Sequence, residues 1–202
     1  LAHTPSCTAA ESCPPSELAK RLQRPHRAET TTRGDDSLPR TMAATDLDTA
    51  AAQQLYGSKY THNVMFLCNH NSCRSQMADA WLRTIAAQRE MEVGVASAGI
   101  VGGTAVKEGA ITVMGEVGVD ISGYTSDAMA DFDHERFDAV ISCCGCGDKL
   151  NDEKAVWKAR ALFEDWNLDD PPAIDPGDLS EFRRVRDEIK VKVEELLDFL
   201  AE

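Results

Sequence analysis

The sequence predicts an α/β fold: a small doubly wound sheet of four parallel strands with helices on both faces, preceded by a disordered N-terminal extension. From residue 63 onward, short apolar runs alternate with amphipathic stretches, a pattern typical of a parallel sheet wound with helices. Residues 1–58 instead contain Pro-, Ser-, Thr- and Ala-rich runs without a sustained apolar period. We therefore expect a disordered or targeting extension at 1–58 and one folded domain at 59–202.

Four short apolar runs mark the expected strands, at 64–68, 93–97, 137–142 and 162–165. The first, VMFLC, is apolar throughout, as expected of a strand buried on both faces. In a doubly wound sheet the binding crevice lies beyond the carboxyl ends of the strands. Cys68, Cys143 and the segment after Asp165 all follow such ends, so we expect them to border one site.

Three amphipathic stretches mark the expected helices. Helical spacing of apolar residues runs over 73–88, over 106–117 and, most clearly, along the C-terminal stretch. Gly118 follows the second stretch as a helix stop. The last stripe consists of Phe182, Val185, Ile189, Val193, Leu196, Leu197 and Leu200.

The net charge of -13 lies entirely in the second part of the chain. Residues 1–60 hold seven Lys/Arg and seven Asp/Glu, whereas residues 61–202 hold 14 and 27. Such an acidic domain would be repelled by nucleic acid and anionic lipid, and no apolar run approaches the ~18 residues of a transmembrane helix. We expect no nucleic acid and no membrane as partners, and an anionic substrate would need a local cluster of donors.

The seven cysteines are an odd number, several are clustered, and no signal-peptide stretch precedes them. This favours metal or redox chemistry in a reducing compartment over a secreted disulfide framework. We expect a cytoplasmic protein, with a plastid or mitochondrion as the alternative if residues 1–58 are a transit peptide. Met42 is an alternative start, and acidic residues within the extension argue against a transit peptide.

The segment between the first strand and the first helix has the composition of an oxyanion-binding loop. It reads Cys68-Asn69-His70-Asn71-Ser72-Cys73-Arg74-Ser75. In a strand-loop-helix turn of this length, backbone N–H groups can converge on a tetrahedral oxyanion, and Arg74 can add a bidentate fork. The positive field favours the thiolate of Cys68, Ser75 can hydrogen-bond it, and Asn71 can hold a left-handed turn. The alternative is a buried strand-end thiol beside a solvated arginine.

The segment CNHNSCRSQMADAW closely resembles the catalytic loop of the low-molecular-weight protein tyrosine phosphatase superfamily, in the version carried by arsenate reductases. Further matches follow at 97–100 (SAGI), at 110–126 (AITVMGEVGVDISGYTS) and at 163–171 (FEDWNLDDP). The resemblance spans about residues 62–200. It implies a phosphatase-like catalytic domain at 59–202, with Cys68 as nucleophile and Arg74 as oxyanion clamp.

Asp170 precedes Pro171 and matches the Asp-Pro loop of that superfamily. The resemblance implies that Asp170 protonates the leaving oxygen, because an oxide leaves poorly until it gains a proton. A plain turn is the alternative, since Asp and Pro both favour turns. Pro172, Ala173 and Ile174 follow, in place of the aromatic residues of phosphotyrosine-specific members, which favours a small inorganic substrate.

A second cysteine cluster, Cys143-Cys144-Gly145-Cys146-Gly147, follows the third strand. From the residues alone, a metal site with Cys73 and a redox relay both remain open, and we predict no metal. The arrangement resembles the glutathione- and glutaredoxin-coupled branch of the arsenate reductases, with Cys144 and Cys146 as relay thiols and Cys143 as an extra one. Asp79 and Ser97 match positions where some relatives bind potassium.

The resemblance implies an arsenate reductase whose thiol-disulfide relay is regenerated by glutathione and glutaredoxin. Arsenate is the expected substrate with phosphate as its analogue, and glutaredoxin or thioredoxin is the expected transient redox partner. Glutathione would be a co-substrate, with no cofactor bound. One alternative is a low-molecular-weight phosphatase that hydrolyses phosphate monoesters through a phosphocysteine. Another is a non-catalytic thiol sensor, against which the joint presence of Cys68, Arg74 and Asp170 argues.

Overall fold

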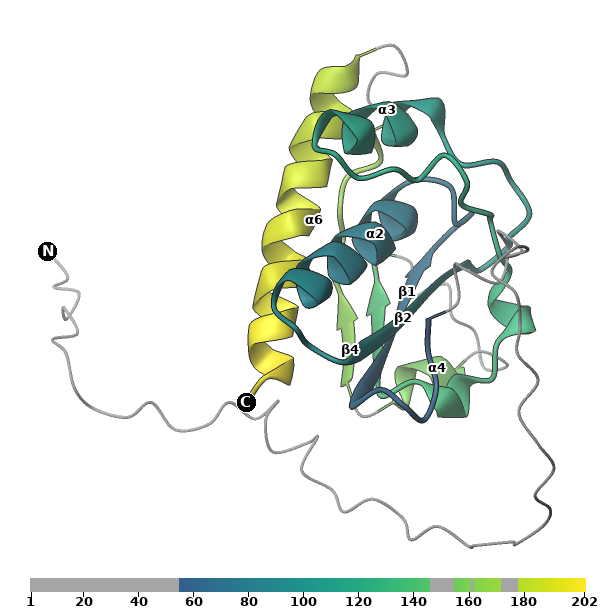
Figure 1. The fold of residues 1–202 in the computed structure, drawn as a ribbon. Helices are drawn as coiled ribbons and strands as arrows, with labels where there is room; N and C mark the ends of the chain where they lie inside the picture. Colours follow the sequence, from purple (N-terminus) through teal and green to yellow (C-terminus); the bar gives the residue numbers. More distant parts are fainter. Residues whose placement is uncertain (1–54, 146–154, 161, 172–177) are drawn as a thin grey trace, which may run out of the picture.

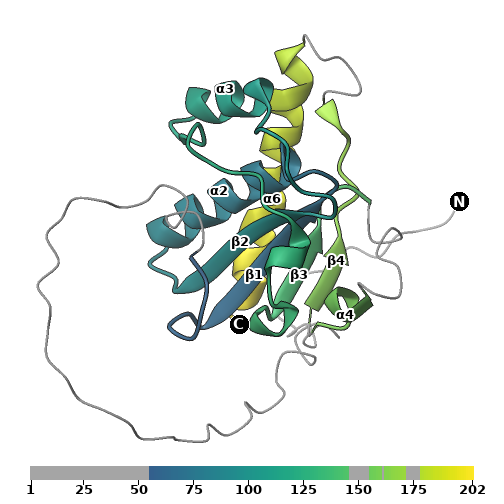
Figure 2. The ribbon, with the colours of Figure 1, turned by 90° about the vertical axis from the view of Figure 1, so that its right-hand side faces the viewer.

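The computed structural model describes residues 55–145, 155–160, 162–171 and 178–202. Its centre is a four-stranded sheet in the order β2-β1-β3-β4, visible in Figure 2. The strands are β1 (His62–Cys68), β2 (Val93–Gly99), β3 (Ala139–Ser142) and β4 (Leu162–Asp165). All three pairings are parallel, so the predicted sheet is confirmed.

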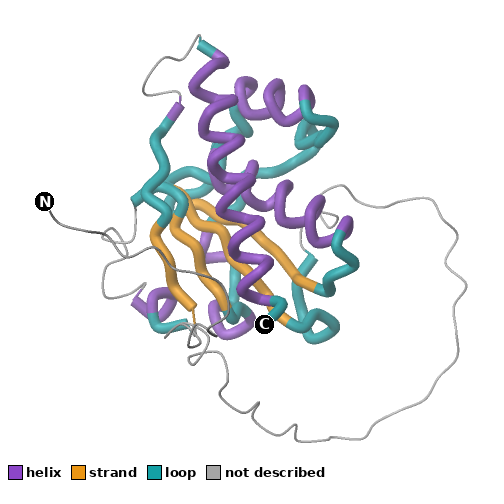
Figure 3. The backbone as a smooth tube through the Cα atoms, turned by 90° about the vertical axis from the view of Figure 1, so that its left-hand side faces the viewer, coloured by secondary structure: helices purple, strands orange, loops and turns teal. Residues whose placement is uncertain are grey.

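Three helices cover one face of the sheet, as Figures 1 and 3 show. They are α2 (Arg74–Gln88), α3 (Glu108–Glu116) and the long α6 (Leu179–Leu200). The opposite face is covered by shorter pieces: the 3-10 turns η2 (Met129–Asp131) and η3 (His134–Arg136) and the helix α4 (Ala155–Lys158). The sequence pattern missed these pieces, because three or four residues are too few to display a helical period.

β1 is one of the two inner strands and is buried on both faces. Val64, Phe66 and Cys68 pack into the cluster shared with α2 and α6, whereas Met65 and Leu67 pack into the second cluster with Phe137 and Trp157. This two-sided burial explains why VMFLC is apolar without alternation.

Local signals fix the start of α6 and the end of α3. Asp178 caps α6 by accepting a hydrogen bond from the Ser180 N–H at 2.7 Å. Gly118 ends α3 with a φ of 78°, a backbone conformation that glycine adopts without strain. The helix expected over 106–117 is therefore slightly shorter, and Val117 is exposed beyond its end.

Of the helices in the described ranges, none combines the length and apolarity that crossing a membrane requires.

The expected boundary near residue 58 remains a prediction, since residues 1–54 lie outside the described residues. The first described residues do contact the domain. Leu55 bridges Val95 of β2, and the ring of Tyr56 lies 4.8 Å from that of Phe137 and 6.0 Å from that of Phe132, measured between ring centroids. Because of these contacts, we expect residues 55–57 to be part of the folded domain.

Truncation tests this boundary. We expect deletion of residues 1–54 to leave Tm nearly unchanged, whereas deletion of 1–58 should lower it by roughly 3 °C or more, because the Tyr56 packing is lost. Thermal unfolding of both truncated proteins measures the difference. Tyr56→Ala in the full chain is the matched control and should reproduce the decrease. Equal Tm values for the two truncations would place the boundary at 58.

Candidate active site

The loop 69–73 connects the carboxyl end of β1 to the N-terminus of α2, with Cys68 as the last strand residue and Arg74 as the first helical one. Gly99, the last residue of β2, lies against this loop. A Cβ at Gly99 would come within 2.8 Å of the His70 carbonyl carbon and 2.9 Å of the Asn71 nitrogen. The glycine of the SAGI motif is therefore required for the close approach of β2 to the loop.

The carbonyl groups of the loop point outward and are satisfied by neighbouring segments. The carbonyls of Cys68 and Asn69 accept from the N–H groups of Ile100 (2.9 Å) and Val101 (3.0 Å). The His70 carbonyl accepts from the hydroxyls of Ser126 (2.7 Å) and Thr104 (3.1 Å). The Ser72 carbonyl accepts from the Lys107 N–H (2.7 Å). With the carbonyls turned out, the amides turn in. Several loop amides have no acceptor among the described residues, namely those of Asn69, His70, Ser72, Cys73 and Arg74. Such a ring of free N–H groups at a helix N-terminus binds a tetrahedral anion.

Asn71 holds the loop in shape from inside the protein. Its φ of 49° is the left-handed turn that the sequence predicted. Its side-chain oxygen accepts from the Asp127 N–H at 2.8 Å and from the Gln76 amide at 2.9 Å, and its side-chain amide donates to the Ser75 hydroxyl at 3.0 Å. Asn71 and Gln76 are fully buried, so these bonds are shielded from water and rigidify the loop.

Cys68 is a buried residue, 4% exposed, and its sulfur lies at the floor of the loop. It accepts a hydrogen bond from the Asn71 N–H at 3.0 Å and lies 2.9 Å from the Ser75 hydroxyl. Because Ser75 already accepts from the Asn71 side chain, its own proton is available to the sulfur. Two donors directed at one sulfur stabilise the thiolate, which is the nucleophilic form.

Arg74 reaches from the start of α2 to the segment after β4. One terminal nitrogen donates to the Leu168 carbonyl at 2.8 Å, and the other pairs with the Asp170 carboxylate at 3.0 Å. The Nε atom is buried and has no partner among the described residues. Since a buried unpaired donor is costly, this N–H is suited to an anion bound beside it.

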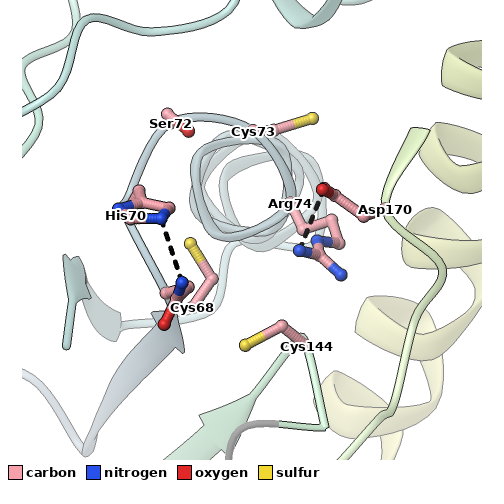
Figure 4. Close-up of a pocket in the computed structure, with 8 residues that line it drawn as sticks. Cys68, His70, Ser72, Cys73, Arg74, Cys144 and Asp170 are labelled. Carbon is pink, nitrogen blue, oxygen red and sulfur yellow. Dashed lines mark hydrogen bonds and ion pairs between the residues drawn. The ribbon is translucent and has the colours of Figure 1, made fainter. Parts of the chain in front are cut away.

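A cavity of about 220 Å³ opens above Cys68. Figure 4 shows Arg74 paired with Asp170, and Cys144 below Cys68 in this view. The described residues that line the cavity are Cys68, Asn69, His70, Ser72, Cys73, Arg74, Cys144 and Asp170. The structure therefore brings together the predicted nucleophile, clamp, acid and first relay cysteine, while Asn71 and Ser75 lie behind the wall against the Cys68 sulfur.

The thiols around the cavity differ in their environments. Burial raises the pKa of Cys73 to about 12 and that of Cys143 well above its ordinary value, so both are neutral thiols at neutral pH. Cys143 is fully buried and packs in the core, whereas Cys144 is half-buried and is disulfide-bonded. Cys146 lies outside the described residues.

These environments predict the order of alkylation. In the folded protein at neutral pH, iodoacetamide should modify Cys68 while Cys73 and Cys143 stay unmodified, because only a thiolate reacts at an appreciable rate. Peptide mass spectrometry after a short exposure measures this, and the unfolded protein, in which all reduced cysteines react, is the control. Modification of Cys73 as fast as Cys68 would contradict the assignment.

Asp79 and Ser97, the positions that resemble a potassium site, are both buried. The Arg83 guanidinium forms an ion pair with Asp79, and the burial that raises the pKa of this carboxyl is opposed by that charge. The other Asp79 oxygen and the Ser97 hydroxyl have no partner among the described residues. Potassium would have to share the carboxylate with an arginine, so these residues do not fit it and we assign it no step. Across the described ranges, no cluster of three or more His, Cys, Asp or Glu suits a metal ion.

Comparisons with known proteins agree with the site. The sequence profile of the low molecular weight phosphotyrosine protein phosphatase family matches residues 63–202. The glutaredoxin arsenate reductase of Synechocystis sp. is 45% identical over 66% of this chain and 95% of its own length. The arsenate reductase of Staphylococcus xylosus is 39% identical over 65% and 92%. A solved arsenate reductase in the phosphate binding state superposes with a TM-score of 0.61 at 42% identity, covering 69% of this chain and 99% of that one.

The profile spans the region that folds around Cys68, from β1 through α6. The chain belongs to the low molecular weight phosphotyrosine protein phosphatase family.

Proposed function

We propose that this chain is an arsenate reductase, which converts arsenate to arsenite through Cys68 and a thiol-disulfide relay that begins at Cys144. The observation that carries the proposal is that Cys68 and Cys144 line the same cavity. Hydrolysis of a phosphate ester needs only the first of these thiols, whereas reduction needs a second sulfur within reach. The arsenate reductases among the relatives support the same activity.

The cavity favours a small inorganic oxyanion. None of the described residues that line it is Phe, Tyr or Trp, so this wall has no ring on which a phosphotyrosine side chain would stack. The inward amides of the loop and the unpaired Arg74 Nε supply donors on several sides of a tetrahedral anion. In an acidic chain, these donors are the local positive potential that draws arsenate to the sulfur.

The first step forms a bond between the Cys68 sulfur and arsenic and expels one oxygen as water. Asp170, at the wall of the cavity, is placed to deliver the proton that this oxygen needs. Its neighbour Asp169 points elsewhere and pairs with Arg184 at 2.8 Å. Asp170 is therefore the carboxyl that we assign as the acid.

The second step transfers two electrons from sulfur to arsenic. Once the disulfide of Cys144 has been reduced, its thiolate attacks the Cys68 sulfur, the sulfur–sulfur bond forms, and the sulfur–arsenic bond breaks with its electron pair left on arsenic. Overall, dihydrogen arsenate, two thiols and one proton yield arsenous acid, one disulfide and one water. The Cys146 thiolate would then attack the Cys144 sulfur and release the Cys68 thiolate. The reductant would act on the resulting Cys144–Cys146 disulfide.

We infer that glutathione with glutaredoxin regenerates the thiols, on the basis of the Cys144-Gly145-Cys146 arrangement and the similarity to the glutaredoxin arsenate reductase. No bound cofactor is needed for this exchange. A reducing compartment such as the cytoplasm is required for turnover.

The direct test is arsenate reduction by the purified protein, followed as arsenite formed. Glutathione plus glutaredoxin should sustain turnover, and thioredoxin plus its reductase, tested in parallel, should be clearly slower. Hydrolysis of an aryl phosphate is the comparison reaction. Absence of arsenite with both reductants, together with rapid hydrolysis, would contradict the proposal.

Phosphate monoester hydrolysis is the second candidate, and membership of the phosphatase family favours it. Cys68, Arg74 and Asp170 suffice for a phosphocysteine mechanism. In that case Cys144 would line the cavity without taking part in turnover.

A further inference from the structure

The turn that carries Cys144 is pressed against the segment that follows β4. Gly145 has a φ of 62° and Asn167 a φ of 47°, so both lie in the left-handed region. A Cβ at Gly145 would collide with the side-chain oxygen of Asn167. The backbone at Gly145 therefore fits closely against Asn167, and a residue that holds it there also holds the neighbouring Cys144 at the cavity.

Asp165 is that residue. It is the last residue of β4 and lies beside Ser142 in the sheet register. One of its carboxylate oxygens accepts from the Gly145 N–H at 2.9 Å and from the Asn167 N–H at 3.1 Å. A single carboxylate thus ties the relay turn to the left-handed turn at Asn167, and bonds to a charged acceptor are stronger than neutral ones.

The other anchors in this region do not involve the Gly145 amide. Trp166 N–H donates to the Ser142 carbonyl at 2.8 Å, and Leu168 N–H donates to the Cys143 carbonyl at 3.0 Å. The Leu168 carbonyl in turn accepts from Arg74. The segment leading to Asp170 therefore keeps its place without Asp165, whereas the Gly145 amide bonds to no other acceptor among the described residues.

We propose that Asp165 is a positioning residue for the relay: it holds the Cys144 turn at the cavity that contains Cys68, so that the reduced Cys144 can reach the Cys68 sulfur. The carboxylate acts through its hydrogen bond to Gly145, not through its charge, because a negative charge beside Cys144 would disfavour the thiolate. This inference rests on the proposed function, in which Cys144 attacks Cys68.

The experiment measures the Cys68–Cys144 cross-link without arsenate. In the full chain with Cys146→Ser, the reduced protein is treated with diamide, which accepts two electrons and two protons as the two thiols join. Cross-link formation is followed by mass spectrometry of the alkylated, unreduced protein. Four variants are compared in this background: Asp165→Ala, Asp165→Asn, Gly145→Ala and Asp133→Ala. Aryl phosphate hydrolysis is measured for each.

Asp165→Ala should slow the cross-link about tenfold, the effect of losing a bond to a charged acceptor, while hydrolysis changes by less than about threefold. Asp165→Asn keeps the accepting oxygen and should remain within about threefold of the reference. Gly145→Ala disturbs the same turn from the other side and should slow the cross-link as well. Asp133 is the matched control, because it accepts from the Glu135 N–H at 3.0 Å at the opposite end of the sheet.

Three results would overturn the assignment: an unchanged cross-link rate in Asp165→Ala, an Asn variant as slow as the Ala variant, or hydrolysis lost in parallel with the cross-link. The first means that Asp165 does not hold the turn. The second means that charge is what matters, and the third that Asp165 supports the whole site. Failure of the proposed function appears separately, as absence of arsenite from the unsubstituted protein while the cross-link still depends on Asp165.

Discussion

Cys68→Ser is expected to abolish arsenate reduction and aryl phosphate hydrolysis together, each by at least about a thousandfold. Both reactions begin with attack of the same thiolate, and a serine hydroxyl at this place remains protonated because nothing beside it is a strong base. The hydrogen bonds from Asn71 and Ser75 stabilise an anion on sulfur but cannot generate one on a serine oxygen. Steady-state rates of both reactions provide the measurement.

Two controls make the loss specific to the nucleophile. Cys73→Ser replaces a thiol of the same cavity that stays neutral, with a pKa of about 12, and should keep most of both activities. Phosphate should still raise the Tm of Cys68→Ser, because the loop amides and Arg74 remain in place. Substantial hydrolysis by Cys68→Ser would move the nucleophile to another residue.

The parts of the site that sequence alone predicted are those with local causes. The turn from Cys68 to Arg74 is fixed by a buried strand, a short polar loop and a helix start, all adjacent in the chain. The left-handed conformation of Asn71 and the contact of Ser75 with the sulfur follow from the same short segment. Each of these predictions is confirmed by the structure.

The parts that sequence did not predict depend on contacts between distant segments. Asp127 and Gln76 brace Asn71, and the Leu168 carbonyl holds Arg74, yet no spacing in the chain reveals these partners. The one hint in the sequence was Gln76, a polar residue directly after Ser75 that lies on the buried side of α2.

The residues alone did not separate the clustered cysteines, and only the family resemblance assigned Cys144 and Cys146 to the relay with Cys143 as an extra thiol. Beyond Ser142 the strand ends, so the alternation of faces along a strand no longer applies to Cys143 and Cys144. The structure separates the two: Cys143 packs in the core, and Cys144 lines the cavity. Cys144 thus becomes the thiol on which the reductase proposal depends.

Cys144→Ser is expected to collapse multiple-turnover arsenate reduction by at least about a hundredfold while aryl phosphate hydrolysis stays within about threefold of the unsubstituted protein. Hydrolysis uses Cys68, Arg74 and Asp170, and water completes it. Reduction needs a second sulfur in the cavity. Cys73 and Cys144 both line it with Cys68, but the sulfur of Cys73 points away from Cys68 (Figure 4), which leaves Cys144. Arsenite formation with glutathione and glutaredoxin measures the first reaction, and release of the aryl alcohol measures the second.

Cys146→Ser separates the order of the relay. If Cys144 attacks first, this variant completes one turnover and then stalls with Cys68 and Cys144 joined, a species that mass spectrometry of the alkylated, unreduced protein detects. Cys143→Ser is the matched control: it also removes a thiol of the cluster, but one that is buried away from the cavity, so it should matter much less for reduction. If Cys144→Ser and Cys146→Ser both reduce arsenate at the unsubstituted rate, the relay does not exist, and Cys68 acts alone, as it would in a phosphatase.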